Sequence, residues 1–188
     1  MIEIDQRRRW NGNGHLLLIG PGAVGKSTLG PILAPLLHRS PVDLDREFSR
    51  RNGEIDAFIG VQGYDRYKQL NSALAKEIMT SSQCDLMVAT SSGFLTKDNP
   101  PASLKSNFKL LAGSYSICLL LSRDLERAVS IIVDRQLQRS FARDRTREEE
   151  TIRTRFPVYV ALGDIVVFSE ASPNDVAQKV AGRLLIRV

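Results

Sequence analysis

The sequence predicts an α/β fold in which a five-stranded parallel sheet lies between two layers of helices. The first observation is that apolar runs of strand length alternate along the chain with longer stretches of helical periodicity. The second is that Leu16 to Ile19 and Ile117 to Leu121 are continuously apolar, which is typical of strands covered by helices on both faces. The third is a glycine-rich turn at residues 20–27 that joins the first strand to the first helix.

Each element is assigned from its own apolar pattern. The expected strands, in chain order, are His15 to Ile19, Val42 to Leu44, Leu86 to Thr90, Tyr115 to Leu121 and Ile165 to Phe168. The expected helices are Lys26 to His38, Tyr64 to Thr80, Asp124 to Asp134, Arg147 to Arg155 and Pro173 to Leu185. Turn residues make Asp98 to Pro101 an expected loop. No linker or repeat divides the 188 residues, so 1–188 is expected to be a single domain.

Composition bears on where the protein acts. No apolar run approaches the roughly 20 residues that a membrane-spanning helix needs, and the N-terminus, with Arg7, Arg8 and Arg9 among acidic residues, lacks the apolar core of a signal peptide. Cys84 and Cys118 are too far apart for a Cys-x-x-Cys motif and are expected to be buried thiols. We therefore expect a cytoplasmic protein, a monomer, with no membrane partner.

Charge and aromatic content indicate the kind of ligand. The net charge of +5 suits an anionic substrate, although a solvated basic surface is the commoner cause of such a balance. Aromatic residues make up 6% of the chain and do not interleave with the basic segment at 135–147, as a platform for stacking nucleic-acid bases would require. The expected partner is a small-molecule substrate and not a nucleic acid.

A nucleotide site is predicted by the motif G-x-x-x-x-G-K-[ST], which here follows an expected strand and opens an expected helix. Its glycines let the backbone amides point at phosphate oxygens, Lys26 reaches the β- and γ-phosphates, and the Ser27 hydroxyl coordinates magnesium. The expected cofactors are therefore ATP and Mg²⁺. The residues predicted to bind the nucleotide are Gly22, Ala23, Val24, Gly25, Lys26, Ser27 and Thr28. GTPases, ATPases and small-molecule kinases share this loop, so it does not identify the acceptor.

Two carboxylates follow the second expected strand, and strand alternation would place Asp43 and Asp45 on one face at the sheet edge. Either could instead cap a helix that begins near Arg46. From here to Ile59 the sequence resembles the shikimate kinase family, whose second strand ends in Asp-x-Asp. The resemblance runs from Gly14 to about Asp175, and it is carried by the blocks Gln62-Gly63-Tyr64, Val88-Ala89-Thr90 and Arg155-Phe156-Pro157-Val158-Tyr159.

That resemblance implies a P-loop NTPase-type three-layer α/β/α fold, nucleoside-monophosphate-kinase-like, and the phosphorylation of shikimate to shikimate 3-phosphate in aromatic amino-acid biosynthesis. It also implies an acceptor-binding region at about 43–72 and a basic lid at about 135–147 that closes over ATP. The implied catalytic residues are Lys26, Asp45 and Arg139, of which Arg139 also binds ATP. The implied metal ligands are Ser27 and Asp43, and the implied substrate contacts are Asp45, Lys68, Ser92, Gly93 and Arg155.

The chemistry of the residues fits these roles, because an aspartate can orient a hydroxyl and take its proton, and an arginine can bind a carboxylate through two hydrogen bonds.

Three departures from the family pattern concern the acceptor and the lid. Ser91-Ser92-Gly93 stands where the family has a glycine triplet, Tyr67-Lys68-Gln69-Leu70-Asn71 where it has Phe-Arg-x-x-Glu, and Arg139-Ser140-Phe141 where it has Arg-Pro-Leu. They leave two alternatives open. One is a diverged kinase that acts on another polyol or cyclic acid. The other is a ligand-sensing domain from a transcription regulator that binds an aromatic acyl-CoA, although the intact nucleotide motif favours catalysis.

Overall fold

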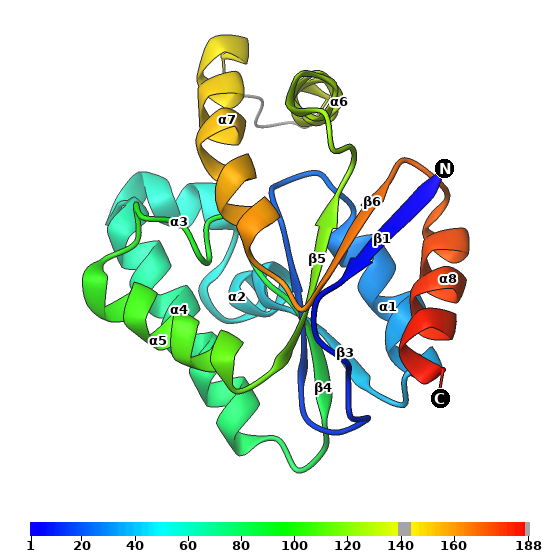
Figure 1. The fold of residues 1–188 in the computed structure, drawn as a ribbon. Coiled ribbons are helices and arrows are strands. Elements are labelled where there is room, and N and C mark those ends of the chain that lie inside the picture. Colours follow the sequence, from blue (N-terminus) through cyan, green and yellow to red (C-terminus); the bar gives the residue numbers. More distant parts are fainter. Residues whose placement is uncertain (139–143, 187–188) are drawn as a thin grey trace.

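The computed structural model describes residues 1–138 and 144–186. Its strands are β1 (Ile2–Gln6), β2 (Leu16–Ile19), β3 (Ser40–Asp43), β4 (Leu86–Ala89), β5 (Tyr115–Leu120) and β6 (Ile165–Ser169). They form one sheet with the order β1-β6-β5-β2-β4-β3 (Figure 1). The five expected strands are all present and all parallel to their neighbours. The predicted class is therefore confirmed, but the predicted strand number is wrong, because β1 adds an antiparallel edge beside β6.

The helices are α1 (Lys26–Leu36), α2 (Leu44–Asn52), α3 (Ile55–Gln62), α4 (Tyr64–Ser81), α5 (Pro101–Ala112), α6 (Leu125–Leu137), α7 (Arg145–Ala161) and α8 (Pro173–Leu185). Figure 1 shows α1 and α8 on one side of the sheet and α4 and α5 on the other. In the same view α6 and the beginning of α7 stand at the end of the sheet where β5 runs into α6. This is the edge at which ligands bind in parallel sheets.

The core has two halves, one on each face of the sheet. Leu16 and Leu18 of β2 pack in a cluster that includes side chains of α1 and α8, whereas Leu17 and Ile19 pack in a second cluster with side chains of α4 and α7. All four are fully buried. The continuous apolar composition of the central strands is explained, because every position of β2 faces helices on one side or the other.

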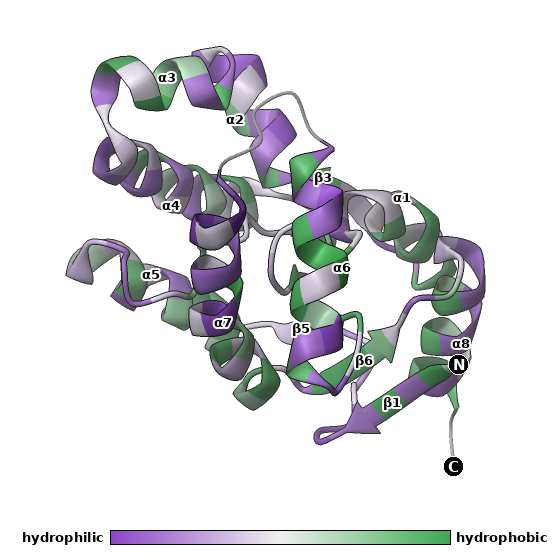
Figure 2. Cartoon of the chain, turned by 90° about the horizontal axis from the view of Figure 1, so that it is seen from above, coloured by the Kyte–Doolittle hydropathy of each residue, from purple (hydrophilic) through white to green (hydrophobic). Residues whose placement is uncertain are grey.

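The strand that the sequence analysis missed is short and mostly polar, as its colouring in Figure 2 shows. Ile2 and Ile4 pack against the core cluster that contains α1 and α8. The alternate residues Glu3 and Asp5 each accept a hydrogen bond of 2.6 Å from Arg123. One face of β1 is thus apolar and the other is paired with a residue more than 100 positions away, which a local pattern does not reveal.

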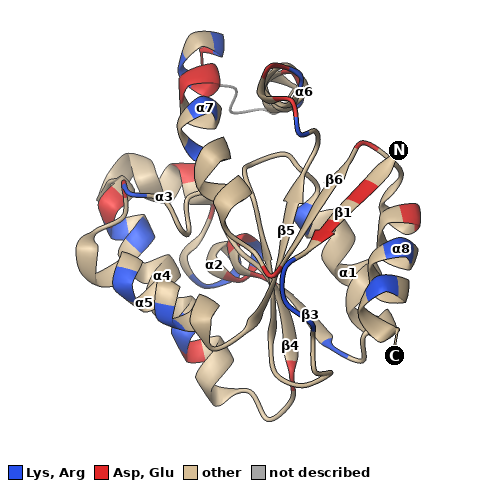
Figure 3. Cartoon of the chain, viewed as in Figure 1, with Lys and Arg blue, Asp and Glu red and all other residues tan. Residues whose placement is uncertain are grey.

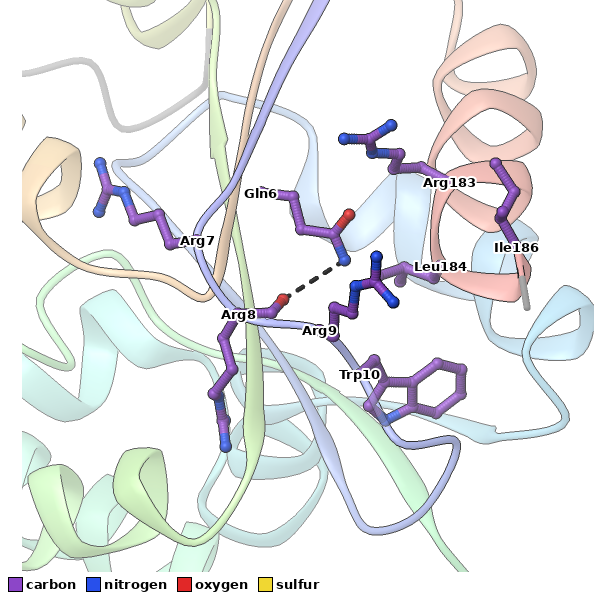
Figure 4. A pocket seen from close by; sticks show the side chains of 8 residues that line it. All are labelled: Gln6, Arg7, Arg8, Arg9, Trp10, Arg183, Leu184 and Ile186. Atoms are coloured by element: carbon purple, nitrogen blue, oxygen red, sulfur yellow. Dashed lines mark hydrogen bonds between the residues drawn. The ribbon is translucent and has the colours of Figure 1, made fainter. Parts of the chain in front are cut away.

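The arginine run after β1 holds this segment to the sheet. Arg8 forms a 2.6 Å ion pair with Asp164, and Arg7 donates to the carbonyl groups of Val160 and Leu162. Arg7, Arg8 and Trp10 all line a cavity of about 370 Å³ at this corner, and Figure 4 shows that the side chains of the two arginines point away from Trp10. Two of the three arginines are therefore committed to structural contacts within the chain.

Three helices were not expected from the sequence. α2 is polar and is stabilised by its charges, since Glu47 accepts hydrogen bonds from Arg50 and Arg51. α5 begins at Pro101, in the expected loop, because proline is favoured in the first turn of a helix. The structure also has α3, and it extends α7 well beyond Arg155 through Pro157.

Two further expectations concern single residues and membrane spans. Cys118 is buried as expected, but Cys84 is exposed, so the expectation of two buried thiols is wrong for Cys84. Within residues 1–138 and 144–186, no helix combines the length and the apolar character needed to cross a membrane.

Candidate active site

The phosphate loop turns sharply between β2 and α1, and its backbone conformation requires glycine. Gly20 has φ of 144°, and a Cβ there would lie 2.4 Å from the carbonyl oxygen of Leu119 in the neighbouring strand. Gly25, the N-cap of α1, has φ of 99°, and no side chain caps the first turn. The amide groups that begin α1 are thus available to an anion, and the positive end of the helix favours one.

The side chains of the loop differ in how far they are buried. Lys26 is 7% exposed, and its Nζ donates to the carbonyl oxygens of Gly20 and Pro21 at 2.7 Å each. Val24 is in the core, so it can offer only its backbone to a nucleotide. Ser27 and Thr28 are exposed at the start of α1. The loop is therefore preformed, with Lys26 held against it.

Asp43 ends β3 and caps α2. Its Oδ1 accepts hydrogen bonds from the amides of Asp45 at 3.0 Å and Arg46 at 3.1 Å, so the helix-cap alternative applies to Asp43. Asp45 lies in the first turn of α2 and not on the strand, so the expectation that strand alternation aligns the two carboxylates is wrong. The strand ends at Asp43, one residue before the expected end at Leu44, because the Asp43 side chain caps the helix that begins there.

The other oxygen of Asp43 has a distinct environment. Its Oδ2 is buried and has no hydrogen-bond partner, and Asp43 lines a cavity of about 370 Å³ together with Ser27. A carboxylate oxygen and a hydroxyl oxygen are ligands that suit Mg²⁺. Among the described residues there is no group of three or more His, Cys, Asp or Glu side chains that could hold a metal ion.

A second cavity, of about 270 Å³, lies between the phosphate loop, the α2–α4 region and α7. Gly22 of the loop lines it together with Asp45, Ser92 and Arg155. Residues far apart in the sequence therefore meet at one place, beside the loop predicted to hold ATP. We call this space the acceptor cavity.

Within the acceptor cavity, Asp45 is held by a tyrosine. The hydroxyl of Tyr67 donates to Asp45 Oδ1 at 3.0 Å. Tyr67 is 6% exposed, stacks on Tyr64 with ring centroids 5.8 Å apart and meets Phe48 edge-on at 4.9 Å. Burial, reinforced by the charge of Asp45, raises the pKa of Tyr67, so the phenol stays protonated and remains a donor. Sequence reasoning missed this hydrogen bond, which joins residues 22 positions apart.

Arg155 also lines the acceptor cavity and contacts one of these tyrosines. Its guanidinium donates to Ser92 Oγ at 3.1 Å and to the hydroxyl of Tyr64 at 3.4 Å. Gly93 packs close to Tyr64 and Arg155, since a Cβ there would lie 3.2 Å from the Tyr64 hydroxyl oxygen and 3.4 Å from Arg155 Nη2. The Ser92 carbonyl accepts a 2.9 Å hydrogen bond from Tyr159. The predicted contacts Ser92, Gly93 and Arg155 therefore form one cluster.

Lys68, another predicted substrate contact, lies elsewhere. It does not line the acceptor cavity; its Nζ donates to the backbone carbonyl of Asp98 and lies 4.4 Å from the centroid of the Tyr64 ring. Two of the departures from the family pattern contact each other, because Ser91 Oγ donates to Asn71 Oδ1 at 3.2 Å and both residues are buried. Only the folded chain shows that these two replacements are partners.

The structure describes only part of the expected lid at 135–147. Arg139 and Arg143 lie outside the described residues. Arg135, at the end of α6, donates to the carbonyl of Ala23 in the phosphate loop at 3.2 Å, whereas Arg145 pairs with Asp134 at 2.6 Å. Figure 3 shows basic and acidic residues side by side on α7. Arg135 is therefore an arginine of this segment that the structure brings to the nucleotide loop.

Sequence reasoning missed Gln136 altogether. It lines the acceptor cavity, and its Nε2 lies 2.5 Å from the place that a Cβ on Gly22 would occupy. Its only sequence signal is its position next to Arg135, because a neutral amide contributes nothing to a charge pattern.

Comparison with known proteins identifies relatives of the whole chain and of part of it. A sequence model of the shikimate kinase family matches residues 22–185. The shikimate kinase of Pseudomonas paraeruginosa is 28% identical over 90% of this chain and 95% of its own length. The pentafunctional AROM polypeptide of Clavispora lusitaniae is 30% identical over 63% of this chain. This chain spans only 7% of that polypeptide and 8% of its counterpart in Scheffersomyces stipitis.

Solved structures agree in fold. Shikimate kinase from Acinetobacter baumannii in complex with shikimate superposes with a TM-score of 0.73 at 22% identity, covering 92% of this chain and 93% of that one. A gluconokinase from Sinorhizobium meliloti superposes with a TM-score of 0.56 at 15% identity, covering 94% of this chain and 93% of that one. These similarities establish the architecture that was expected from the sequence.

Proposed function

Because the chain belongs to the shikimate kinase family, we propose that it transfers the γ-phosphoryl group of ATP to a hydroxyl group of shikimate, giving shikimate 3-phosphate. The observation that carries the proposal is the acceptor cavity, in which Asp45 and Arg155 face the phosphate-loop residue Gly22. Relatives named shikimate kinase that match almost their full length support it.

On the nucleotide side, the amides at the start of α1 would hold the phosphates, and Lys26 would exchange two neutral carbonyl partners for phosphate oxygens. Ser27 and Asp43 would hold Mg²⁺, which neutralises phosphate charge when it is bound. Arg135 reaches the phosphate loop and is proposed to contact the nucleotide. The resemblance implies the same role for Arg139. We propose that Arg139 also contacts ATP, and the KM for ATP of Arg139→Ala would test this.

On the acceptor side, Arg155 would bind the carboxylate of the substrate through its planar guanidinium. Asp45 would accept a hydrogen bond from the attacking hydroxyl and take its proton as the new bond to phosphorus forms. Tyr67 keeps the carboxylate of Asp45 oriented by donating to its Oδ1. All these side chains belong to one chain, so we propose that a single copy is active.

The test is release of ADP, measured in a coupled assay with and without shikimate. We expect release that depends on shikimate, and we expect Lys26→Ala to abolish it while the protein stays folded. Absence of shikimate-dependent release from the folded wild-type protein would refute the proposed reaction. Binding of an aromatic acyl-CoA without ADP release would instead favour the ligand-sensing alternative.

One observation is equally compatible with a different acceptor. Among the described residues that line the acceptor cavity, Arg155 is the single cation, because Lys68 is turned away. A cavity with one cation suits a related cyclic acid or a polyol as well as shikimate. The same assay run with a panel of small cyclic acids and polyols separates these acceptors by their kcat/KM values.

A further inference from the structure

Two largely buried cations share one carboxylate behind the acceptor cavity. The side chains of Lys68 and Arg155 are 6% and 13% exposed, and each lies 3.5 Å from Oδ2 of Asp98. Both also contact Tyr64, Lys68 over the face of its ring and Arg155 at its hydroxyl. These four residues come from α4, from the segment before α5 and from α7.

The shared carboxylate keeps two like charges compatible. Because both nitrogens lie 3.5 Å from the same oxygen, they are at most about 7 Å apart, a distance at which like charges shielded from water repel strongly. Asp98 offsets that repulsion and gives both cations a partner. Without it, Arg155 would lose a contact that fixes its Nη2 and would be pushed away from Lys68.

Asp98 is itself held in place before any ligand arrives. Thr96 donates a hydrogen bond to its other carboxylate oxygen, and the side chain of Asn99 donates to the carbonyl groups of Gly93 and Thr96 at 2.5 and 2.8 Å. Burial would raise the pKa of Asp98, but the hydrogen bond from Thr96 and the charges of Arg155 and Lys68 outweigh it, so its pKa is lowered. The carboxylate is therefore charged at neutral pH.

Only one of the three charged residues in this cluster lines the acceptor cavity. Arg155 lines the acceptor cavity, whereas Asp98 and Lys68 do not. We propose that Asp98 is a positioning residue that holds the Arg155 guanidinium toward the acceptor, and that Lys68 anchors Asp98 and does not bind substrate. This inference rests on the proposed function, in which Arg155 binds the acceptor carboxylate.

The deciding measurement is the acceptor KM at saturating ATP. Asp98→Asn keeps the size of the side chain but removes its charge, and it should raise the KM for shikimate roughly 10-fold or more, with kcat and the KM for ATP within about twofold. Adding Lys68→Met to Asp98→Asn should return the acceptor KM most of the way to the wild-type value, because it removes the positive charge that the asparagine cannot balance. Rescue by a second substitution is not expected of a residue that merely supports the fold.

Asp65→Asn is the matched control. Asp65 also lies 3.5 Å from Lys68, but its side chain is 80% exposed and has no contact with Arg155, so its loss should leave the acceptor KM unchanged. A lower KM in Asp98→Asn would overturn the proposal, since it would mean that Asp98 competes with the substrate for Arg155. An unchanged KM, or no rescue by Lys68→Met, would overturn it as well.

A second readout does not depend on the acceptor. The rate at which phenylglyoxal modifies Arg155, followed by peptide mass spectrometry, should rise severalfold in Asp98→Asn and not in Asp65→Asn, because the guanidinium loses its carboxylate partner. If the wild-type protein does not phosphorylate shikimate, the proposed function fails and this rate alone decides the inference. An Asp98→Asn rate equal to that of the wild type would then refute it.

Discussion

Replacing Tyr67 by phenylalanine removes the hydroxyl that donates to Asp45 Oδ1 at 3.0 Å and leaves the ring in place. A hydrogen bond to a charged acceptor contributes about 1.5 to 3 kcal/mol, and each 1.4 kcal/mol corresponds to a factor of about ten in rate. Water can replace part of the lost contact in the cavity, so we expect the lower end of that range. The predicted effect of Tyr67→Phe is a kcat lowered about 10-fold.

The binding of ATP should not change, because Tyr67 does not belong to the phosphate loop. The fold should also persist, since the ring keeps its packing against Phe48 and Tyr64. We therefore expect the free energy of unfolding to change by less than about 1.5 kcal/mol. Steady-state kinetics with each substrate varied in turn, together with urea unfolding, measure all three quantities.

Tyr115→Phe is the matched control. The Tyr115 hydroxyl donates to the carbonyl of Arg8 at 2.7 Å, at the opposite end of β5 from the acceptor cavity, so its loss should leave kcat unchanged. A kcat for Tyr67→Phe within twofold of the wild-type value, in a protein that folds normally, would refute the view that Tyr67 orients Asp45.

Three further substitutions test other parts of the site. Arg155→Ala should raise the acceptor KM roughly 30-fold or more, with ATP binding nearly unchanged and Arg155→Lys recovering only part of the loss; an unchanged acceptor KM would contradict carboxylate binding. Arg135→Ala should raise the KM for ATP several-fold, whereas Arg145→Ala, which removes an exposed pair with Asp134, should not; equal effects would remove Arg135 from the nucleotide site. Gly20→Ala should destabilise the protein by more than about 2 kcal/mol, because its Cβ would meet the Leu119 carbonyl at 2.4 Å; a melting temperature equal to that of the wild type would contradict this.

The features that sequence reasoning predicted well depend on contacts between near neighbours. The phosphate loop and the strand and helix on either side of it lie within residues 16–36, and the sequence motif predicts all three. The continuous apolar runs predicted strands covered on both faces, and both core clusters bear this out. Local patterns identify such elements because their backbone conformation and burial are set by residues close in the sequence.

The errors arise where tertiary contacts decide. β1 is held by pairing with β6 and by Arg123, more than 100 residues away, and its own five residues carry too little apolar signal. The second expected strand ends at Asp43 and not at Leu44, because the Asp43 side chain accepts hydrogen bonds from two amides of the next helix. Lys68 stands where the resemblance implies a family arginine, yet its Nζ contacts the backbone carbonyl and the carboxylate of Asp98, 30 residues away, and the side chain does not line the acceptor cavity.

The sequence by itself determined the fold class and the nucleotide loop, because these depend on residue type and on short spacings, and its resemblance to the shikimate kinase family implied Asp45 as the base and Arg155 as the cation of the site. Only the tertiary structure decided how they combine. In the folded chain Tyr67 donates a hydrogen bond to Asp45. Arg155 contacts Ser92 and Asp98, and Arg135 contacts the phosphate loop. The physical reason is that a hydrogen bond or an ion pair depends on distances of about 3 Å, and such distances between α2, α4, α6 and α7 exist only after the sheet and its helices have packed.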